Sequence, residues 1–150
     1  MPRDLRAFVR DSILVLEREA PAFYASFAAA LRGRRLLVSG DGDPFTLAFS
    51  TRAVEFVRSD GSAELCLRVD RPTILALVEA DLALEDALRL DRLMVRGNLE
   101  NVVDLFDGLS VYLRGAVRCP SFPALLSAFR THGAGVSREV RYEPEAPFLT

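Results

Sequence analysis

The N-terminal part of the chain carries apolar residues at helical spacing, with charged residues on the opposite side. The inward stripe consists of Leu5, Phe8, Val9, Ser12, Ile13 and Leu16. This pattern begins at Arg3 or Asp4, and Pro21 suits the first turn of a second helix that ends near Gly33. The sequence therefore predicts two N-terminal helices.

Between residues 34 and 70 the helical spacing gives way to the alternation that is typical of strands. Residues 34–50 have the pattern of two strands joined by a turn at 40–44. Residues 53–70 repeat that pattern around a turn at 59–62. We expect these segments to form a meander of four antiparallel strands with one apolar face.

Helical spacing returns after Asp70, which is placed to cap a helix with Pro72 in its first turn. Residues 80–91 are ambiguous and predict either a short helix or an irregular crossing. In both cases Leu82, Leu84 and Leu88 are expected to face inward. The apolar run at 92–96 predicts a fifth strand.

A helix is predicted to follow the fifth strand, from a cap at Asn98 through Leu109. Residues 110–120 either extend this helix or form an extended segment. Ser121 is placed to begin a last helix that ends near Gly133, and residues 134–150 form a polar, Pro-rich tail that we expect to be loosely ordered. A strand followed by glycine and a helix can hold a phosphate. A turn at Gly97 and a cap at Asn98 explain the junction without one.

The composition narrows the class of protein. A length of 150 residues fits a single domain, 1–150, with its own core. The net charge of -2 gives no basic face for nucleic acid, and all 19 basic residues are arginine, which excludes lysine-dependent chemistry. No run approaches the roughly 18 apolar residues of a membrane span, and no secretory signal pattern is present. We expect a bacterial, cytoplasmic protein with no nucleic-acid partner and no integral membrane segment.

Reactive side chains are scarce. The only histidine, His132, stands beside Gly133 at a predicted helix end, which favours a capping role over catalysis. Cys66 and Cys119 lie in different predicted elements, and we favour two reduced thiols over the alternative of one disulfide. One histidine and two distant cysteines do not predict a zinc site. Motifs for nucleotide phosphates or a nucleophilic serine are missing. We therefore expect no metal, no cofactor and no dedicated catalytic residue.

The order of the predicted elements resembles that of the sterol carrier protein type 2 family. The resemblance is carried by LCLRVDRPTILALVEADLALEDALRLDRLMVRGNLENVVDLFDGL at 65–109 and by the strand pattern before it, and covers about residues 34–113. It includes the strand ending Leu93–Asn98 and the spaced apolar residues of the helix that follows. The resemblance implies an α+β fold with a five-stranded mixed, mostly antiparallel sheet, covered on one face by helices.

The same resemblance implies an apolar tunnel between sheet and helices, and a binding or carrier function for a hydrophobic small molecule. A lipid, fatty acyl chain, sterol, terpenoid or polyketide would gain about 25 cal/mol for each Å² of apolar surface removed from water. Nine apolar residues are the candidates for ligand contact, although each could instead be ordinary core: Phe45, Leu47, Phe49, Phe56, Ile74, Leu77, Leu99, Val103 and Phe106.

Two other functions stay open. An enzyme such as a cyclase or isomerase could use the tunnel, with Asp86, Asp91 or Glu55 as acid or base and Tyr112 as a proton donor. Alternatively, the domain could be a ligand-free dimerisation module, and a homodimer is compatible with the carrier function as well.

Overall fold

The computed structural model describes residues 4–40, 42–59 and 61–130. The predicted tail at 134–150 and His132 lie outside the described residues. Helices and strands follow one another in this order: α1 (Leu5–Glu19), α2 (Pro21–Ala30), β1 (Arg35–Ser39), β2 (Phe45–Phe49), β3 (Val54–Val57), β4 (Leu65–Val69), α3 (Arg71–Val78), α4 (Leu84–Arg89), β5 (Leu93–Arg96) and α5 (Leu99–Ala116). Residues 122–130 form a further helix.

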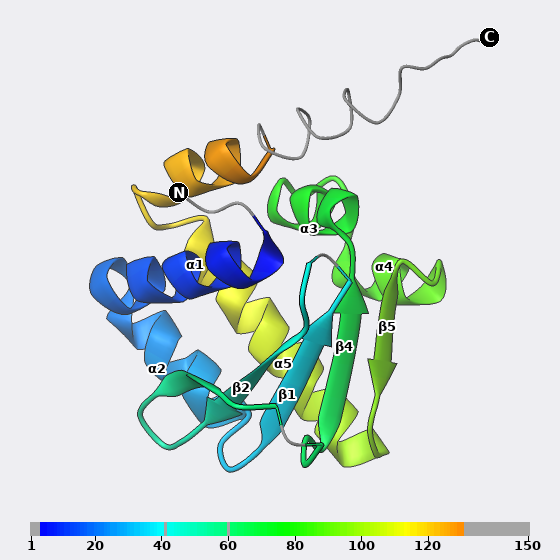
Figure 1. Ribbon diagram of the computed structural model, residues 1–150. Helices are drawn as coiled ribbons and strands as arrows, with labels where there is room; N and C mark the ends of the chain where they lie inside the picture. Colours follow the sequence, from blue (N-terminus) through cyan, green and yellow to red (C-terminus); the bar gives the residue numbers. More distant parts are fainter. Residues whose placement is uncertain (1–3, 41, 60, 131–150) are drawn as a thin grey trace, which may run out of the picture.

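The five strands form one mixed sheet in the order β3-β2-β1-β4-β5. Every neighbouring pair is antiparallel except β1 and β4, which run parallel. This confirms the predicted α+β class with its mixed, mostly antiparallel sheet and two N-terminal helices. Figure 1 shows the sheet with α5 running behind it and α1 and α2 to one side.

The predicted four-strand meander is wrong at its last strand. β4 does not pair with β3; it crosses to the other side of β1, where Leu36 lies opposite Leu65. The connection between β3 and β4 crosses the outer face of β1 and β2, where the Ser59 hydroxyl lies 2.6 Å from that of Thr46. An alternating pattern defines the inward face of a strand but not its neighbour in the sheet, so the crossover could not be derived from it.

The helix starts follow the capping residues that the sequence predicts. The side chains of Asp4, Asp70 and Asn98 each accept a hydrogen bond from the backbone N–H three residues later, at 2.9 Å. α5 continues well beyond the predicted Leu109 to Ala116, which settles the ambiguous segment after it in favour of helix.

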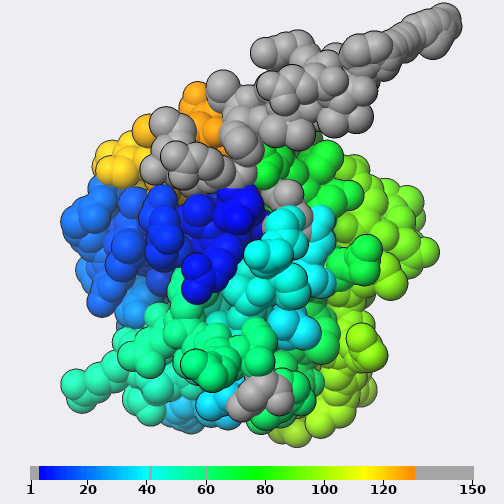
Figure 2. All heavy atoms as spheres, viewed as in Figure 1, coloured from blue at the N-terminus to red at the C-terminus, as the bar shows by residue number. Residues whose placement is uncertain are grey.

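One glycine fixes how closely the helices approach. A Cβ built on Gly115 of α5 would stand 2.7 Å from the Leu16 Cδ1 of α1 and 2.7 Å from the Phe23 Cβ of α2. The C-terminal half of α5 therefore packs directly on both N-terminal helices. At the other end of α1, a Cβ built on Gly42 in the turn between β1 and β2 would lie 3.2 Å from the Asp4 Cβ. Figure 2 shows the blue segment of α1 against the cyan segment of the chain.

The two faces of the sheet differ in polarity. The inward-facing Leu36, Leu47 and Leu67 are buried, whereas Arg68 and Arg96 on the opposite face are exposed. The hydrophobic core therefore lies between the sheet and the helices, on one side only.

Candidate functional site

A cavity of about 100 Å³ lies between the sheet and the helices. Its wall presents only carbon atoms, because the polar atoms of the lining residues point elsewhere. The lining residues come from four strands and all five of the helices α1–α5: Leu5, Phe8, Val9, Ile13, Phe27, Leu36, Val38, Leu47, Leu67, Val69, Ile74, Leu77, Val78, Leu84, Leu93, Leu109, Tyr112 and Leu113. Such a wall favours hydrocarbon, since it offers no hydrogen bond to a polar group.

The sheet builds the floor of the cavity through strand alternation. Leu36 and Val38 project from β1 to the same side as Leu47 of β2 and Leu67 of β4. All four side chains are buried. The floor is therefore formed by three adjacent strands, and the helices above it decide how much space remains.

Tyr112 lines the cavity with its ring, while its hydroxyl is engaged with α1. The Ser12 hydroxyl lies 2.9 Å from the Val9 carbonyl oxygen and 2.6 Å from the Tyr112 hydroxyl. Ser12 has a single proton, which it donates to Val9, so Tyr112 must be the donor to Ser12. Burial raises the pKa of Tyr112 to about 12, although the bond with Ser12 acts in the opposite direction.

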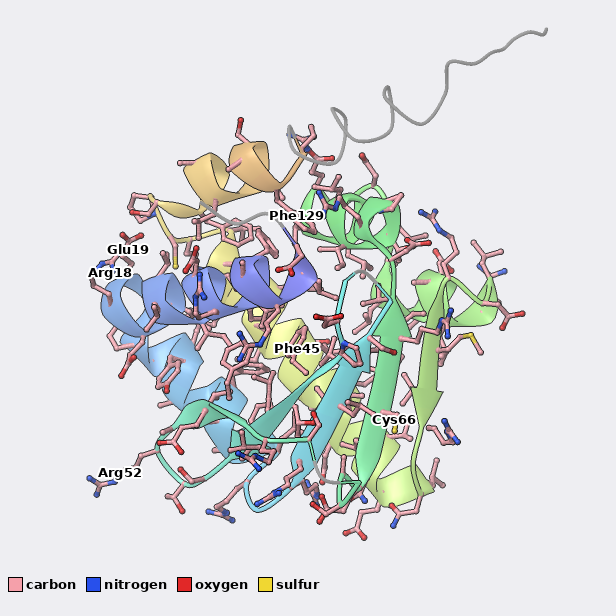
Figure 3. The ribbon with its side chains drawn as sticks, in the orientation of Figure 1. Arg18, Glu19, Phe45, Arg52, Cys66 and Phe129 are labelled. Atoms are coloured by element: carbon pink, nitrogen blue, oxygen red, sulfur yellow. The ribbon has the colours of Figure 1, made fainter. Side chains whose placement is uncertain are left out.

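The last helix contacts Phe8, a residue of the cavity wall, through the rings of Phe122 and Phe129. The ring of Phe8, which lines the cavity, stacks on that of Phe129 with 4.4 Å between centroids. The guanidinium of Arg71 lies over Phe129, and its Nη1 donates to the Phe129 carbonyl at 3.0 Å. Helix 122–130 is thereby attached to both α1 and α3, and Figure 3 shows Phe129 on it, beside α3.

At its start this helix is held by Glu19, at the end of α1 (Figure 3). The Glu19 carboxylate accepts hydrogen bonds from the backbone N–H and the hydroxyl of Ser121. The hydroxyl bond to Ser121 is the main cause of a lowered pKa for Glu19. Ser121 does stand before the helix, as predicted, but its hydroxyl donates to α1.

Three of the nine predicted ligand-binding residues line the cavity, namely Leu47, Ile74 and Leu77. The three phenylalanines of β2 and β3 lie on the inward side but outside the cavity wall. Phe49 packs edge-on against Phe27 at 5.3 Å, one layer behind the wall.

Phe45 and Phe56 pair with each other at 5.4 Å between ring centroids, and the guanidinium of Arg6 lies over the Phe56 ring. The structure thus brings these two rings together as core beneath α1. Figure 3 shows Phe45 projecting from β2 toward the helix layer.

The remaining predicted residues lie on the N-terminal half of α5, outside the cavity wall. Leu99 is 79% exposed and Val103 is 50% exposed, while Phe106 is partly buried against the core. Leu88 of α4, expected to face inward, is also exposed. Leu88 stands four residues after Leu84, but it lies at the end of α4, which finishes at Arg89. The inward face of this short helix is filled by Leu84 and Ala87.

The acidic residues considered for catalysis do not reach the cavity. Asp86 forms an ion pair with Arg89 at 2.5 Å, and Glu55 is exposed on a strand whose outward positions face away from the helices. Asp91 is exposed at a turn with a positive φ of 60°. The structure therefore separates all three carboxylates from the apolar interior.

Other reactive groups in the described part of the chain form no cluster. Cys66 is half-buried on the outward side of β4 (Figure 3), and Cys119 is buried on the other side of the molecule. Both thiols are free, and burial raises the pKa of Cys119. Within residues 4–40, 42–59 and 61–130, no group of three His, Cys, Asp or Glu side chains is placed to hold a metal ion.

The residues that sequence analysis missed come mainly from α1 and β1. Leu5, Phe8, Val9 and Ile13 belong to the stripe that predicted α1, and their position over the sheet could be known only from the packing. Leu36 and Val38 belong to the first predicted strand, but alternation along a strand does not distinguish a cavity wall from ordinary core.

The geometry defines an α+β domain that encloses an apolar cavity between one sheet face and its helices. Several solved structures share this architecture, including the following two. One, described as a UbiJ-SCP2 ubiquinone synthesis protein, has 20% sequence identity and a TM-score of 0.55, and the match covers 77% of this chain and 95% of the other. A crystal structure of sterol carrier protein 2 has 16% identity and a TM-score of 0.52 over 75% of this chain and 95% of the other.

At these identities the matches establish the fold, and the chain has the fold of sterol carrier protein 2 domains. The resemblance inferred from the strand and helix order is thereby confirmed at the level of architecture. No protein-family model matches the sequence, and no curated protein does so either. Among the described residues, no helix is both long enough and apolar enough to cross a membrane.

Proposed function

We propose that this chain is a binding or carrier protein for a hydrophobic small molecule, which it holds in the cavity between sheet and helices. The observation that carries this proposal is the carbon-only wall in a domain with the sterol carrier protein 2 fold. Apolar cavities lined by leucine, isoleucine and phenylalanine stay dry and take up apolar ligands. The free energy of binding then comes from removing the ligand's apolar surface from water.

The wall also disfavours catalysis on the ligand. Tyr112 is the one titratable residue in the described cavity wall, its proton is donated to Ser12, and its pKa is raised to about 12. A general acid or base works best with a pKa near the operating pH, which this hydroxyl lacks. A cyclase or isomerase would need a polar group where the cavity offers carbon.

The ligand class follows from the same wall. The buried part of the ligand is hydrocarbon, such as an alkyl, isoprenoid or sterol portion, and an ionised head group would remain outside because burying it unpaired is costly. One neighbour in fold is described as a ubiquinone synthesis protein, which makes a prenylated quinone a sensible member of a test panel. The other members are a fatty acid, a fatty alcohol and a sterol.

Binding can be tested by filling the cavity from one strand. Val38→Phe places a larger side chain in the wall from β1, whereas Leu37→Phe makes a similar change on the opposite face of the same strand. We expect Val38→Phe to weaken binding of a fluorescent fatty acid by about tenfold or more, because the ring occupies the ligand's space. Leu37→Phe should bind like the parent.

Native mass spectrometry of the parent with the ligand panel provides the direct readout. A parent protein that takes up none of the four ligand classes would contradict the carrier function. Equal binding by both β1 variants, with both folded by circular dichroism, would place the ligand somewhere other than this cavity.

A further inference from the structure

One apolar face of α5 runs from inside the cavity to the surface of the molecule. Leu109 and Leu113 belong to the cavity wall. The face continues toward the start of the helix through four residues that we call the α5 stripe: Leu99, Val102, Val103 and Phe106. Their spacing of three or four residues places them on the side that also carries Leu109 and Leu113.

Two residues of this face, Val103 and Leu99, are the most exposed. Val102 and Phe106 are partly buried against the core, Val103 is 50% exposed, and Leu99 is 79% exposed. Large apolar side chains are ordinarily shielded at least in part, and a contiguous set that continues a cavity marks a binding surface rather than a scattered exception. The α5 stripe is therefore the surface extension of the cavity wall.

The cavity wall is partly exposed at its helices and buried at its strands. Wall residues from the strands are all buried, whereas the partly exposed wall residues lie on α1, α3 and α5. On α3 they are Ile74 and Leu77, and on α5 they include Leu109. A ligand that enters between α3 and α5 would thus meet the α5 stripe directly.

The size of the cavity makes such an extension necessary for a long ligand. Its volume of about 100 Å³ lies below the roughly 300–1,000 Å³ of sites that enclose a whole drug-sized molecule. Leu99 and Leu109 are separated by about 15 Å along the helix axis. The stripe therefore adds a track comparable in length to an extended alkyl chain.

We propose that the α5 stripe is the second part of the ligand site, so that the cavity holds one end of a long hydrocarbon and the stripe covers the rest. This inference rests on the proposed carrier function and specifies its ligand class as long-chain apolar molecules. Leu99 and Val103 become determinants of chain length, while the cavity wall determines whether any apolar ligand binds.

The test compares two alcohols that share a head group and differ in length. Hexanol samples the cavity alone, and dodecanol is long enough to reach the stripe. Both are delivered from cyclodextrin, and binding is measured by isothermal titration calorimetry. The variant carries Leu99→Gln together with Val103→Gln, and the matched control carries Leu14→Gln with Val117→Gln, which are exposed apolar positions away from the stripe.

The parent and the control should bind dodecanol more tightly than hexanol. The stripe variant should bind hexanol like the parent but dodecanol about tenfold more weakly, because part of the long chain would remain in water. A stripe variant that retains the full advantage of dodecanol would overturn the inference. So would a parent that binds both alcohols equally, while the cavity-binding function would stand in either case.

Failure of the proposed function has a different signature, because the parent would then bind neither alcohol. Sedimentation velocity of the parent and the stripe variant provides the remaining comparison. If the substitutions convert a parent dimer into a monomer and leave dodecanol binding unchanged, the stripe is an interface between copies and the ligand track is refuted.

Discussion

The two halves of α5 differ in how closely the rest of the molecule packs against them. In the C-terminal half, Gly108 and Gly115 let α2 and α1 approach closely, and Tyr112 donates a hydrogen bond to Ser12 of α1. In the N-terminal half, the outer apolar residues Leu99 and Val103 remain largely exposed. The first half is held by packing, and the second presents apolar surface that the described part of the chain leaves uncovered.

This difference indicates that the two halves of α5 have different roles, one in stability and one in binding. The C-terminal half of α5 fixes the helix against α1 and α2. The N-terminal half costs little to leave open, because the helix is already anchored elsewhere. Substitutions at Gly115 should therefore lower the free energy of unfolding, whereas substitutions at Leu99 and Val103 should affect ligand binding.

The largest effect is expected at Gly115. A Cβ there would meet the Phe23 Cβ at 2.7 Å. The Phe23 Cβ is attached directly to the backbone of α2, so it cannot move aside as the end of a flexible side chain could. We expect Gly115→Ala to lower the free energy of unfolding by about 2 kcal/mol, because the strain of overpacking exceeds the gain in helix propensity. Urea denaturation followed by circular dichroism measures this loss.

Gly108→Ala is the matched control for that substitution. Its added Cβ would lie 3.2 Å from the Leu31 Cδ1, the end of a flexible side chain that can adjust. Its free energy of unfolding should stay within about 1 kcal/mol of the parent value, since the gain in helix propensity offsets a small steric cost. Equal losses at both glycines would show that the Phe23 Cβ does not make position 115 less tolerant of a methyl group than position 108.

A smaller effect, with a distinct pH dependence, is expected for Tyr112→Phe. At neutral pH the loss of the bond to Ser12 should cost about 1 kcal/mol, because Ser12 keeps its bond to Val9 and no donor is stranded. The raised pKa of Tyr112 means that the native state retains the proton after the unfolded chain begins to lose it near pH 10. Parent stability should therefore fall as the pH rises from about 10 toward 12.

Tyr112→Phe removes this contribution, so the gap in stability between parent and variant should narrow over the same alkaline range. The chain has no lysine, so none complicates the measurement. Urea midpoints at a series of pH values, with tyrosinate absorbance to follow ionisation, provide the data. A gap that stays constant from neutral to alkaline pH would mean that Tyr112 ionises equally readily in both states.

Much of the fold could be predicted from local signals because those signals are local in origin. Asp4, Asp70 and Asn98 cap their helices through contacts only three residues away, and strand alternation is set by the backbone itself. The place of β4 in the sheet could not be predicted from alternation. Alternation shows which side chains of a strand face inward, but not which strands lie beside it. Only the resemblance in element order pointed to a mixed sheet.

The candidate site was harder to predict than the fold, and α5 shows why. Helical spacing places Leu99, Leu109 and Leu113 on one face, and only the packing of α3 and the sheet decides which of them are enclosed. For β2 the alternation placed Phe45, Leu47 and Phe49 inward, yet only Leu47 borders the cavity because the rings of its neighbours meet other rings. Sequence periodicity gives direction, whereas a cavity is what remains after all side chains have packed.

The smallest effect on stability is expected for the two outer residues of the α5 stripe. Leu99→Gln and Val103→Gln should each change the free energy of unfolding by less than about 0.5 kcal/mol, because both side chains are at least half exposed and glutamine is a good helix former. Urea midpoints and slopes close to those of the parent would leave the stripe free to act in binding alone. A loss above about 1 kcal/mol at either position would show that these side chains stabilise the core after all. The contrast between the two halves of α5 would then disappear, and with it the reason to assign Leu99 and Val103 to a ligand rather than to the fold.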